Sequence, residues 1–592
     1  MVVDRTRNQQ AQWERKLGLV LEKELKDRYD AKREQQEGST KGLSRKEQFE
    51  TILNVLTRYT NIGVLDVSYR SEDTETAEMI KIYNPVTWVW ESPRFIFKNL
   101  LYTAIGNYSS SDFNTFVNYC YGSLMNNAKG INFVPEPYAG ARYLMFDNGI
   151  LDLSTMELIE IKPLQVKAQT LSGEKVNIPL IKYQPAFNLN GKEIPLPEIG
   201  FTDYHKLHCN WVDISKTGIP QYKGDPKPGQ QPYNFNPVDW MLKTAGGEKE
   251  SQYILAMIGA LLVPNHQFNA FWEINGPSNS GKSTLINLVK DVYNNRGSVI
   301  DGFSIDTLSE TFPFRGTVDN TTNVVAITEV NGASVPKTAI SLVNQFANEG
   351  VSLKQLGGKS MFVTPPPHLV LEGAGWAHFD VTNTGVQRRI IPINLANSKA
   401  STYRAKMKKN VFKQRKFIEC FVYMAVNAYA EMSKGDDNFV FQMDDLDGLP
   451  NFAQAWHMQA ISAGDQYMNN FMDRMLPALH TGYLPLQMMH DIYKKSTEMD
   501  GIETQYQRQI ASFKTAFLIY LKQYGFNVVE YGNEKENKDV LQRHDETELG
   551  IDFDKVKETM DPPDDVKNYA NSKYSVFSTN QWVKIIKTTK EE

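Results

Sequence analysis

The sequence predicts an α/β protein of several domains, built around a parallel sheet that carries a phosphate-binding loop. The stretch FWEINGPSNSGKSTLINLV, residues 271–289, begins like a strand, passes through a loop with glycines five residues apart, and ends as an amphipathic helix. Apolar runs follow in NVVAITEV, HLVLEG and RRIIPINL, as is typical of buried parallel strands. We expect an α+β region before this core, and a helical region with a winged-helix-like end after it.

The composition is that of a globular protein. Hydrophobic residues make up 41% and charged residues 22% of the chain, so its 592 residues can form roughly three to five domains with real cores. The three cysteines exclude a disulfide scaffold and fit a reducing cytosol. No apolar run approaches the ~18 residues that span a bilayer, and a signal peptide's apolar core is missing, so we expect a cytoplasmic protein without a membrane partner. The net charge of −5 does not exclude DNA, because a basic channel leaves little trace in the total.

Residues 1–90 are predicted to form a charged, helical N-terminal region. Apolar side chains recur at four-residue steps and give one long helix a narrow apolar face; they are Trp13, Leu17, Leu21 and Leu25. Two interpretations stay open, a surface helix and an arm for self-association.

Residues 91–237 are predicted to form an α+β domain. YLMFDNGILDLSTMELIEI, residues 143–161, contains two β-rich runs joined by DNG, which predicts a hairpin. The Pro/Gly-rich stretch at 224–237 predicts a loop where this domain ends.

The glycine loop matches the pattern of nucleotide-binding P-loops. Its glycines allow the backbone N–H groups to turn toward phosphates, and the following helix directs its positive end at the anion. Lys282 is placed to reach the β- and γ-phosphates of ATP, and Ser283 to hold Mg²⁺. The predicted nucleotide-binding residues are Gly276, Pro277, Ser278, Asn279, Ser280, Gly281, Lys282, Ser283 and Thr284.

The next apolar strand, 324–327, ends in Thr328 and Glu329 beside the predicted phosphates. A carboxylate at this place orients the attacking water or helps to hold the metal ion. Thr328 occupies the position where such strands usually carry aspartate, so the usual carboxylate ligand is missing there. The metal ion is assigned to Ser283 and Glu329.

Two further features lie within residues 238–398, the predicted ATPase domain. GVSLKQLGGKSMFV predicts a hairpin with Lys354 on one arm and Lys359 at the turn, where lysines are either solvated or in contact with DNA. Arg388 and Arg389 directly precede an apolar strand. Such arginines form surface ion pairs, or one of them reaches a neighbouring subunit's γ-phosphate as an arginine finger.

The C-terminal part is predicted to consist of a helical segment, 399–475, and a separate module, 476–592. In the module two helices are followed by β-like runs around a charged insert. This is the order of a winged helix, a module often used on DNA. A small α+β cap without a ligand is the alternative.

The order of these parts resembles the superfamily three helicases, which are AAA+ ATPases of small DNA viruses, phages and plasmids. More closely it resembles the phage and plasmid primase-helicase family, including the replication initiators of phage-related chromosomal islands. The likeness covers about residues 140–400 and rests on FDNGILDLSTMEL, YQPAFN, GPSNSGKST, KQLGGK and GVQRRIIPI, which stand in the family's order.

The resemblance implies an ATP-dependent DNA helicase that initiates replication of a mobile element in a bacterial host. It implies a homo-oligomeric ring, a hexamer, with ATP between subunits and single-stranded DNA in a central channel. In that ring the catalytic residues would be Lys282, Glu329, Arg388 and Arg389. Lys354 and Lys359 would contact the strand, and the C-terminal module would bind origin duplex or a partner protein.

The chain departs from this family in three places. The family's asparagine sensor for the γ-phosphate is replaced by Glu372, Gly373 and Ala374, and the hairpin region is shorter than the family's. The region ahead of the resemblance is too short for a primer-synthesising domain. We therefore expect no primase activity. Two alternatives stay open: an ATP-dependent origin-binding initiator with little unwinding activity, and a P-loop kinase of small molecules.

Overall fold

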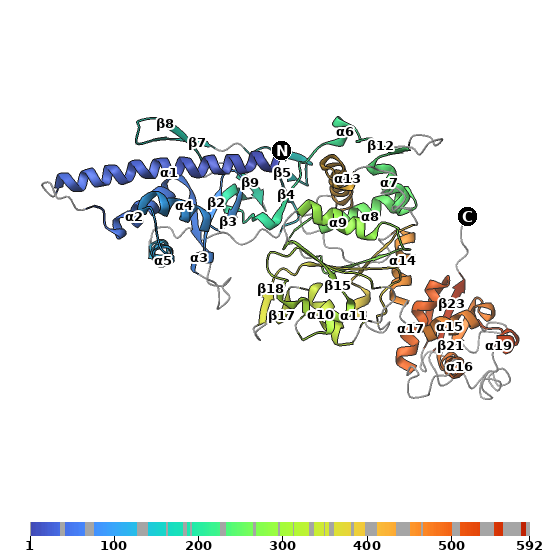
Figure 1. Ribbon diagram of the computed structural model, residues 1–592. Helices are drawn as coiled ribbons and strands as arrows, with labels where there is room; N and C mark the ends of the chain where they lie inside the picture. The colour runs from blue at the N-terminus through green and yellow to red at the C-terminus, as the bar shows by residue number, and fades with distance from the viewer. Residues whose placement is uncertain are drawn as a thin grey trace.

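A computed structural model shows an N-terminal region of helices and small sheets, a central parallel sheet covered by helices, and a C-terminal region of helices and strands (Figure 1). The structure describes residues 2–35, 42–65, 76–126, 140–161, 164–180, 186–189, 192–224, 233–264, 268–293, 297–311, 313–330, 335, 337–348, 350–354, 360–379, 384–396, 411–433, 450–462, 466–499, 510–532, 550–559 and 582–587. Within these ranges no helix combines the length and apolarity that a bilayer crossing requires.

The first helix organises the N-terminal region. α1, Val2–Gln35, packs against α2, Arg45–Tyr59, and α4, Arg94–Ile105. Trp13 and Leu17 are buried at this contact, so the predicted narrow apolar face is confirmed. The same chain covers this face, which favours the surface helix over the self-association arm.

Small antiparallel sheets complete this region. The β7–β8 hairpin lies along α1, where Lys16 Nζ donates to the carbonyl oxygen of Asn177 at 2.8 Å (Figure 1). β3 spans residues 89–91 and so crosses the domain boundary predicted at residue 90. The other predicted domain boundaries stay predictions. The elements are β1 (Asn61–Val64), α3 (Thr76–Met79), β2 (Ile80–Asn84), β3 (Val89–Glu91), α5 (Ser110–Asn126), β7 (Leu164–Gln169), β8 (Lys175–Leu180), β9 (Ala186–Leu189) and β10 (Lys192–Pro195).

The predicted Asp-Asn-Gly hairpin is confirmed. β4, Tyr143–Phe146, pairs with β5, Gly149–Asp152, in a sheet of order β11–β4–β5–β6. Gly149 is required at the turn, because a Cβ there would lie 2.6 Å from the carbonyl oxygen of Ile159. The neighbouring elements are β6 (Glu157–Ile159), β11 (Lys206–Leu207), α6 (Ile214–Thr217), β12 (Tyr222–Gly224) and β13 (Tyr233–Phe235).

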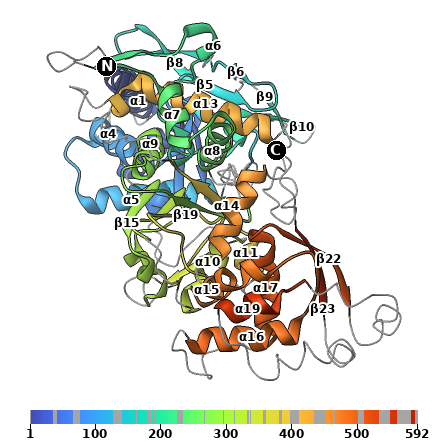
Figure 2. The ribbon, with the colours of Figure 1, turned by 90° about the vertical axis from the view of Figure 1, so that its right-hand side faces the viewer.

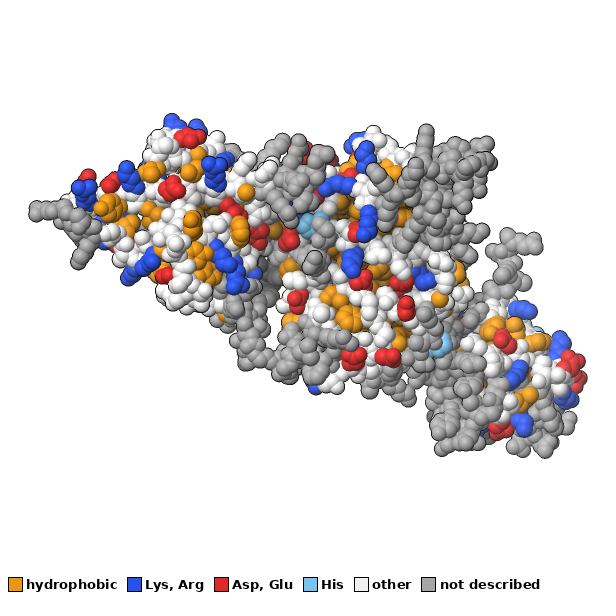
Figure 3. Space-filling model, in the orientation of Figure 1, with side chains coloured by type: hydrophobic (Ala, Val, Ile, Leu, Met, Phe, Trp, Pro, Cys, Tyr) orange, Lys and Arg blue, Asp and Glu red, His pale blue; other side chains and the backbone are white. Residues whose placement is uncertain are grey.

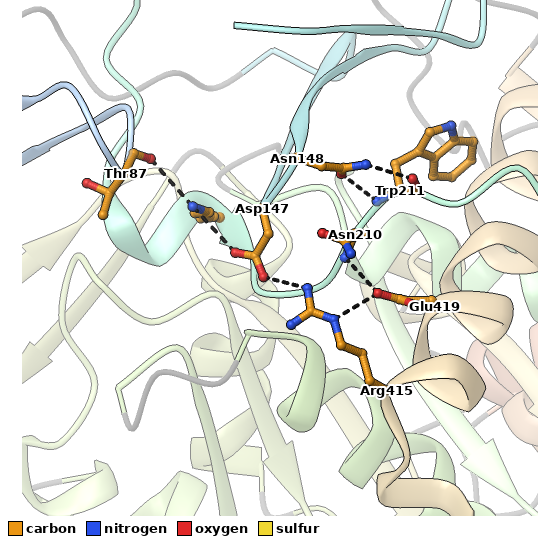
Figure 4. Close-up of polar contacts among 8 residues, drawn as sticks. Thr87, Asp147, Asn148, Asn210, Trp211, Arg415 and Glu419 are labelled. Carbon is orange, nitrogen blue, oxygen red and sulfur yellow. Dashed lines mark hydrogen bonds and ion pairs between the residues drawn. The ribbon is translucent and has the colours of Figure 1, made fainter. Parts of the chain in front are cut away.

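A polar network joins this turn to α13, Arg415–Ser433 (Figure 4). The Arg415 guanidinium donates to a carboxylate oxygen of Asp147 at 2.9 Å and to one of Glu419 at 2.8 Å. Lys206 Nζ lies 3.4 Å from the other oxygen of Asp147. Four charged side chains, Asp147, Lys206, Arg415 and Glu419, therefore meet in one place, which we call the Asp147 joint.

Asn148, the next residue of the turn, is bound to the backbone of Trp211. Its amide donates to the carbonyl oxygen of Trp211 at 2.9 Å and its Oδ1 accepts from the Trp211 N–H at 2.8 Å (Figure 4). Because α13 packs against α8, Glu248–Leu261, the turn connects the small sheets to the central region.

The central sheet has five parallel strands in the order β15–β16–β19–β14–β20. Helices α8, α9 and α13 lie on one face, and α10 and α11 on the other (Figure 1). The predicted mixed α/β class with a parallel sheet is confirmed. The elements are α7 (Pro237–Ala245), β14 (Phe271–Asn275), α9 (Lys282–Tyr293), β15 (Val299–Phe303), β16 (Val324–Ile327), α10 (Lys337–Phe346), β19 (His368–Gly373), α11 (Thr384–Gln387) and β20 (Ile390–Asn394).

Alternate residues of these strands pack into opposite layers of the core. Val324 and Ala326 pack on the side of α8 and α9, whereas Val325 and Ile327 pack on the side of α10. Both faces of the strands are thus apolar, and functional polar side chains gather where the strands end.

The predicted hairpin after the Glu329 strand is confirmed. β17, Val351–Lys354, pairs antiparallel with β18, Ser360–Val363, and Lys354 stands opposite Ser360. Lys359 lies outside the described residues.

The C-terminal region contains a three-stranded antiparallel sheet of order β21–β23–β22. Helices α16 and α17 precede β22, so this part of the predicted succession is confirmed. The second predicted β run, 573–578, lies outside the described residues, and β21 ahead of α16 was not predicted. α17 packs against α14, which leads from the central region into this one (Figure 2). The elements are α14 (Asn451–Ser462), α15 (Gln466–Met475), β21 (Gly482–Pro485), α16 (Leu486–Met499), α17 (Ile510–Gln523), β22 (Phe526–Gly532), α19 (Phe553–Thr559) and β23 (Trp582–Lys587).

Candidate nucleotide-binding site

The glycine loop connects β14 to α9 at the carboxyl edge of the sheet. Gly281 has φ +113° and Asn279 has φ +65°, conformations that bend the loop back over the strand end. A Cβ on Gly276 would lie 2.9 Å from the carbonyl oxygen of Leu395. Both predicted glycines are therefore required by the backbone itself, before any ligand is considered.

The helix that follows starts at Lys282 and is anchored by apolar side chains such as Leu285 and Leu288, which are buried. The N–H groups of Thr284 and Leu285 donate to the carbonyl oxygen of Gly281 at 2.9 and 3.0 Å. The remaining N–H groups of the first turn and the positive end of the helix dipole are directed at the loop, which suits a phosphate.

Lys282 folds back onto the loop. Its Nζ donates to the carbonyl oxygens of Gly276 at 2.7 Å and Pro277 at 3.0 Å, and the residue is only 9% exposed. Burial lowers the pKa of this lysine, and the nearby Glu372 carboxylate opposes that effect. The cation is held by two neutral carbonyl groups, which a phosphate anion can replace.

Ser283 is bound to Glu372, which the sequence placed only at the position of the missing asparagine sensor and not among the metal-holding residues. Its hydroxyl donates to Oε1 of Glu372 at 2.7 Å. Burial raises the pKa of Glu372, whereas the hydrogen bond from Ser283 and the charge of Lys282 lower it. The sequence signal for this residue was present, since HLVLEG is a buried apolar strand that ends in a carboxylate.

Glu329 follows the end of β16 and is exposed, with a left-handed φ of +59°. The next residue, Val330, donates its N–H to the carbonyl oxygen of Glu372 at 2.9 Å. The charge of Glu329 is also among the causes that raise the pKa of Glu372. A left-handed conformation at a non-glycine residue carries strain and redirects its side chain.

Lys282, Ser283, Glu329 and Glu372 thus gather at one edge of the sheet. A serine hydroxyl and one or two carboxylates are the protein groups with which Mg²⁺ is usually held beside phosphates, its other ligands being water and phosphate oxygens. Among the described residues no group of three or more His, Cys, Asp and Glu side chains forms an all-protein metal site. The residues at this edge therefore fit a metal ion that arrives with a nucleotide.

The two predicted catalytic arginines have different surroundings. Arg389 donates to Asn344 Oδ1 at 3.0 Å, to the carbonyl oxygen of Gly385 at 2.7 Å and to Asn348 Oδ1 at 2.8 Å. Arg388, immediately before it, is exposed. The guanidinium of Arg389 is engaged within its own subunit, and that of Arg388 faces outward.

Of the two predicted DNA-binding lysines, Lys354 is exposed on β17. Phe362 on β18, opposite Ser352, is also exposed, at 60%. One face of this hairpin therefore presents a cation and an aromatic ring to solvent.

Comparison with known proteins gives weak likenesses. No family model and no curated protein matches the chain. The solved structures that resemble it include the apo NrS-1 C-terminal region, with 9% identity and a TM-score of 0.32 over 90% of this chain and 98% of that one. An A-form structure of the same region has 10% identity and a TM-score of 0.27 over 60% and 75% of the two chains.

A third structure is the JCV helicase with a bound acetamide compound, at 12% identity and a TM-score of 0.19, covering 44% of this chain and 64% of that one. At these TM-scores the likeness adds nothing to what the residues themselves show.

Proposed function

We propose that this protein is an ATP-dependent DNA helicase and replication initiator of a phage, plasmid or other mobile element, acting as a ring with ATP between subunits. The observation that carries the proposal is the convergence of the glycine loop, Lys282, Ser283 and two carboxylates at one edge of a parallel sheet. The strand order supports an AAA+ core. β14, which leads into the glycine loop, lies between β19, which carries Glu372 near its end, and β20, which follows the two arginines.

Each residue at the edge has a role in hydrolysis. Lys282 exchanges its two carbonyl partners for oxygens of the β- and γ-phosphates and neutralises charge there. Glu329, exposed at the mouth of the site, orients the attacking water. Mg²⁺, bound with the nucleotide, would neutralise the charge that develops on the phosphates.

The proposal of a ring rests on the role that we assign to the two arginines. Arg388 faces outward and is our candidate for the finger that reaches the γ-phosphate bound by a neighbouring subunit. Arg389 positions it, because its three hydrogen bonds fix the chain between α11 and β20. A finger supplied in trans requires a neighbour, so hydrolysis depends on assembly, which we propose is a hexamer.

The β17–β18 hairpin is our candidate for the element that contacts DNA in the channel. Lys354 would bind a phosphate, and Phe362 would stack on a base of the same strand. On the face drawn in Figure 3, the described basic and acidic side chains are interspersed.

The C-terminal module is proposed to be a winged helix. The described succession α15, β21, α16, α17, β22, α19, β23 and the sheet order β21–β23–β22 support this assignment, with α19 inserted between the last two strands. Origin duplex and a partner protein are both candidates for its ligand. Part of α17 is packed against α14 and is therefore not available to either.

Strand displacement on a forked DNA substrate tests the proposal, with Lys282→Ala as the control for ATP dependence. We expect displacement by the wild-type protein and none by the variant. ATP hydrolysis without displacement would favour the origin-binding initiator, and phosphorylation of nucleosides without stimulation by DNA would favour the kinase.

A further inference from the structure

The strand that normally supplies a metal-holding carboxylate to a P-loop does not supply one here. Beyond Ile327, the aspartate position is occupied by Thr328, whose hydroxyl carries no charge. Glu329 comes one residue later, is exposed, and leaves the strand in a left-handed conformation. If Ser283 is to share a metal ion with a carboxylate, that carboxylate has to come from elsewhere.

Glu372 stands in the required place. Its Oε1 accepts the hydroxyl hydrogen of Ser283 at 2.7 Å, and only 6% of the residue is exposed. The charge of Lys282 acts on it as well, so Glu372 interacts with both residues of the glycine loop to which phosphate and metal contacts are assigned.

The sheet explains how a residue 89 positions away reaches Ser283. β19 lies between β16 and β14, and Glu372 is the register partner of Ile274, one residue before the end of β14. Because parallel strands end at the same edge, the Glu372 side chain emerges beside the loop that starts at Gly276. The hydrogen bond from Val330 to the Glu372 carbonyl group holds the end of β16 against it.

Charge indicates what such a carboxylate can do. An asparagine at the end of this strand would donate an N–H to the γ-phosphate, whereas an ionised glutamate would repel it. A carboxylate beside a triphosphate is stabilised when a cation lies between them. Glu372 is therefore suited to a metal ion and unsuited to direct contact with phosphate.

We propose that Glu372 is the carboxylate that, together with Ser283, holds the Mg²⁺ of the bound nucleotide, in place of the missing aspartate of β16. This inference rests on the proposed nucleotide site. It assigns the two carboxylates different tasks: Glu372 positions the metal ion, and Glu329 is left to act on water.

The test measures metal binding without turnover. Mn²⁺ in place of Mg²⁺ is titrated against the protein–ADP complex and followed by electron paramagnetic resonance, for wild type, Glu372→Gln, Glu372→Asp and Glu329→Gln. Thermal unfolding establishes that each variant is folded, and ADP binding without metal is measured in parallel. Glu372→Gln keeps the shape and the hydrogen-bond acceptor but removes the charge, whereas Glu372→Asp keeps the charge and shortens the side chain.

We expect Glu372→Gln to weaken Mn²⁺ binding by at least about 10-fold. Losing a residue that only supports a metal ligand already costs about 10- to 100-fold, and Glu372 is proposed to hold the ion itself. Glu372→Asp should retain more Mn²⁺ affinity than Glu372→Gln, and Glu329→Gln should stay within about threefold of wild type. ADP without metal should bind Glu372→Gln at least as tightly as wild type, because a negative charge is gone.

Three results would overturn the inference while leaving the nucleotide site intact. One is unchanged Mn²⁺ affinity in Glu372→Gln, and another is a large loss in Glu329→Gln. The third is a better Mn²⁺ affinity for Gln than for Asp at 372, which would indicate a neutral hydrogen-bonding sensor. A wild-type protein that binds no ADP, with or without metal, would instead refute both the site and the inference.

Discussion

Glu273 is a buried carboxyl on β14, the strand that leads into the P-loop. Burial raises its pKa to about 8, although a hydrogen bond from the Ala377 N–H lowers it somewhat. The folded protein therefore holds this carboxyl in its neutral form at pH 7. Its contribution to stability is fully present below the ordinary pKa of about 4.5 and is lost as the pH rises through 8.

Glu273→Gln should remove this pH dependence. At pH 9 the variant is expected to be more stable than wild type by on the order of a few kcal/mol, and the difference should shrink toward pH 5. Thermal unfolding at several pH values measures it, with the exposed Glu157→Gln as the matched control. Parallel curves for wild type and Glu273→Gln across this range would contradict the assignment.

The adjacent residues Arg388 and Arg389 should differ in their effects on stability and on ATP turnover. Arg389→Ala removes donors from Asn344, Asn348 and Gly385, and should lower the free energy of unfolding by about 1 kcal/mol. Arg388→Ala should change stability by less than about 0.5 kcal/mol and still abolish ATP turnover. Unfolding and ATPase assays on both variants measure this, and wild-type turnover in Arg388→Ala would exclude it as the finger.

At the scale of elements, the Asp147 joint explains why an Asp-Asn-Gly turn belongs to this fold. The turn fastens one sheet to α13 through Arg415, and to the backbone of Trp211 through Asn148. The Asp-Asn-Gly turn, which belongs to the family signature in the sequence, therefore has a structural role here: it holds the small sheet against α13 and the central region.

Arg415→Met should weaken this connection. The substitution keeps the aliphatic stem but leaves Asp147 and Glu419 without their shared guanidinium, both of them largely buried. We expect a loss of about 1 to 3 kcal/mol in stability. The exposed neighbour Lys416→Met is the control. Equal unfolding transitions for both variants would show that the joint contributes nothing.

At the scale of the whole molecule, the proposed site is incomplete in one subunit. The loop and both carboxylates belong to one protomer, whereas Arg388 would act on its neighbour. Activity should therefore depend on protein concentration and on which subunits adjoin.

Mixing two inactive variants tests this sharing. Arg388→Ala and Lys282→Ala should each abolish ATP turnover, and a mixture should regain part of it, because some junctions then join an intact loop to an intact arginine. ATPase rates of mixtures at several ratios, together with the mass in solution, measure the effect. A mixture as inactive as its components would count against a site between subunits.

Features formed by neighbouring residues could be predicted from the sequence. The strand, loop and helix around Gly276 and Gly281, the hairpin at Gly149 and the β17–β18 hairpin all depend on short-range backbone conformation. The apolar stripe of α1 was also visible, because its period follows from helix geometry. The helix that covers this stripe could not be predicted, because α4, which packs against α1, is distant in the sequence.

The sequence by itself determined the class of the core and the strand, glycine loop and helix within it, since these follow from local propensity and spacing. It also named most of the residues to which we assign the chemistry of the proposed site. Only the tertiary structure decided which of them meet: Glu372 rather than Glu329 on Ser283, and Arg389 bound within its subunit while Arg388 faces outward. The physical reason is the order of the parallel strands. The order of the strands brings together strand ends that are far apart in the sequence, and no local sequence pattern specifies that order.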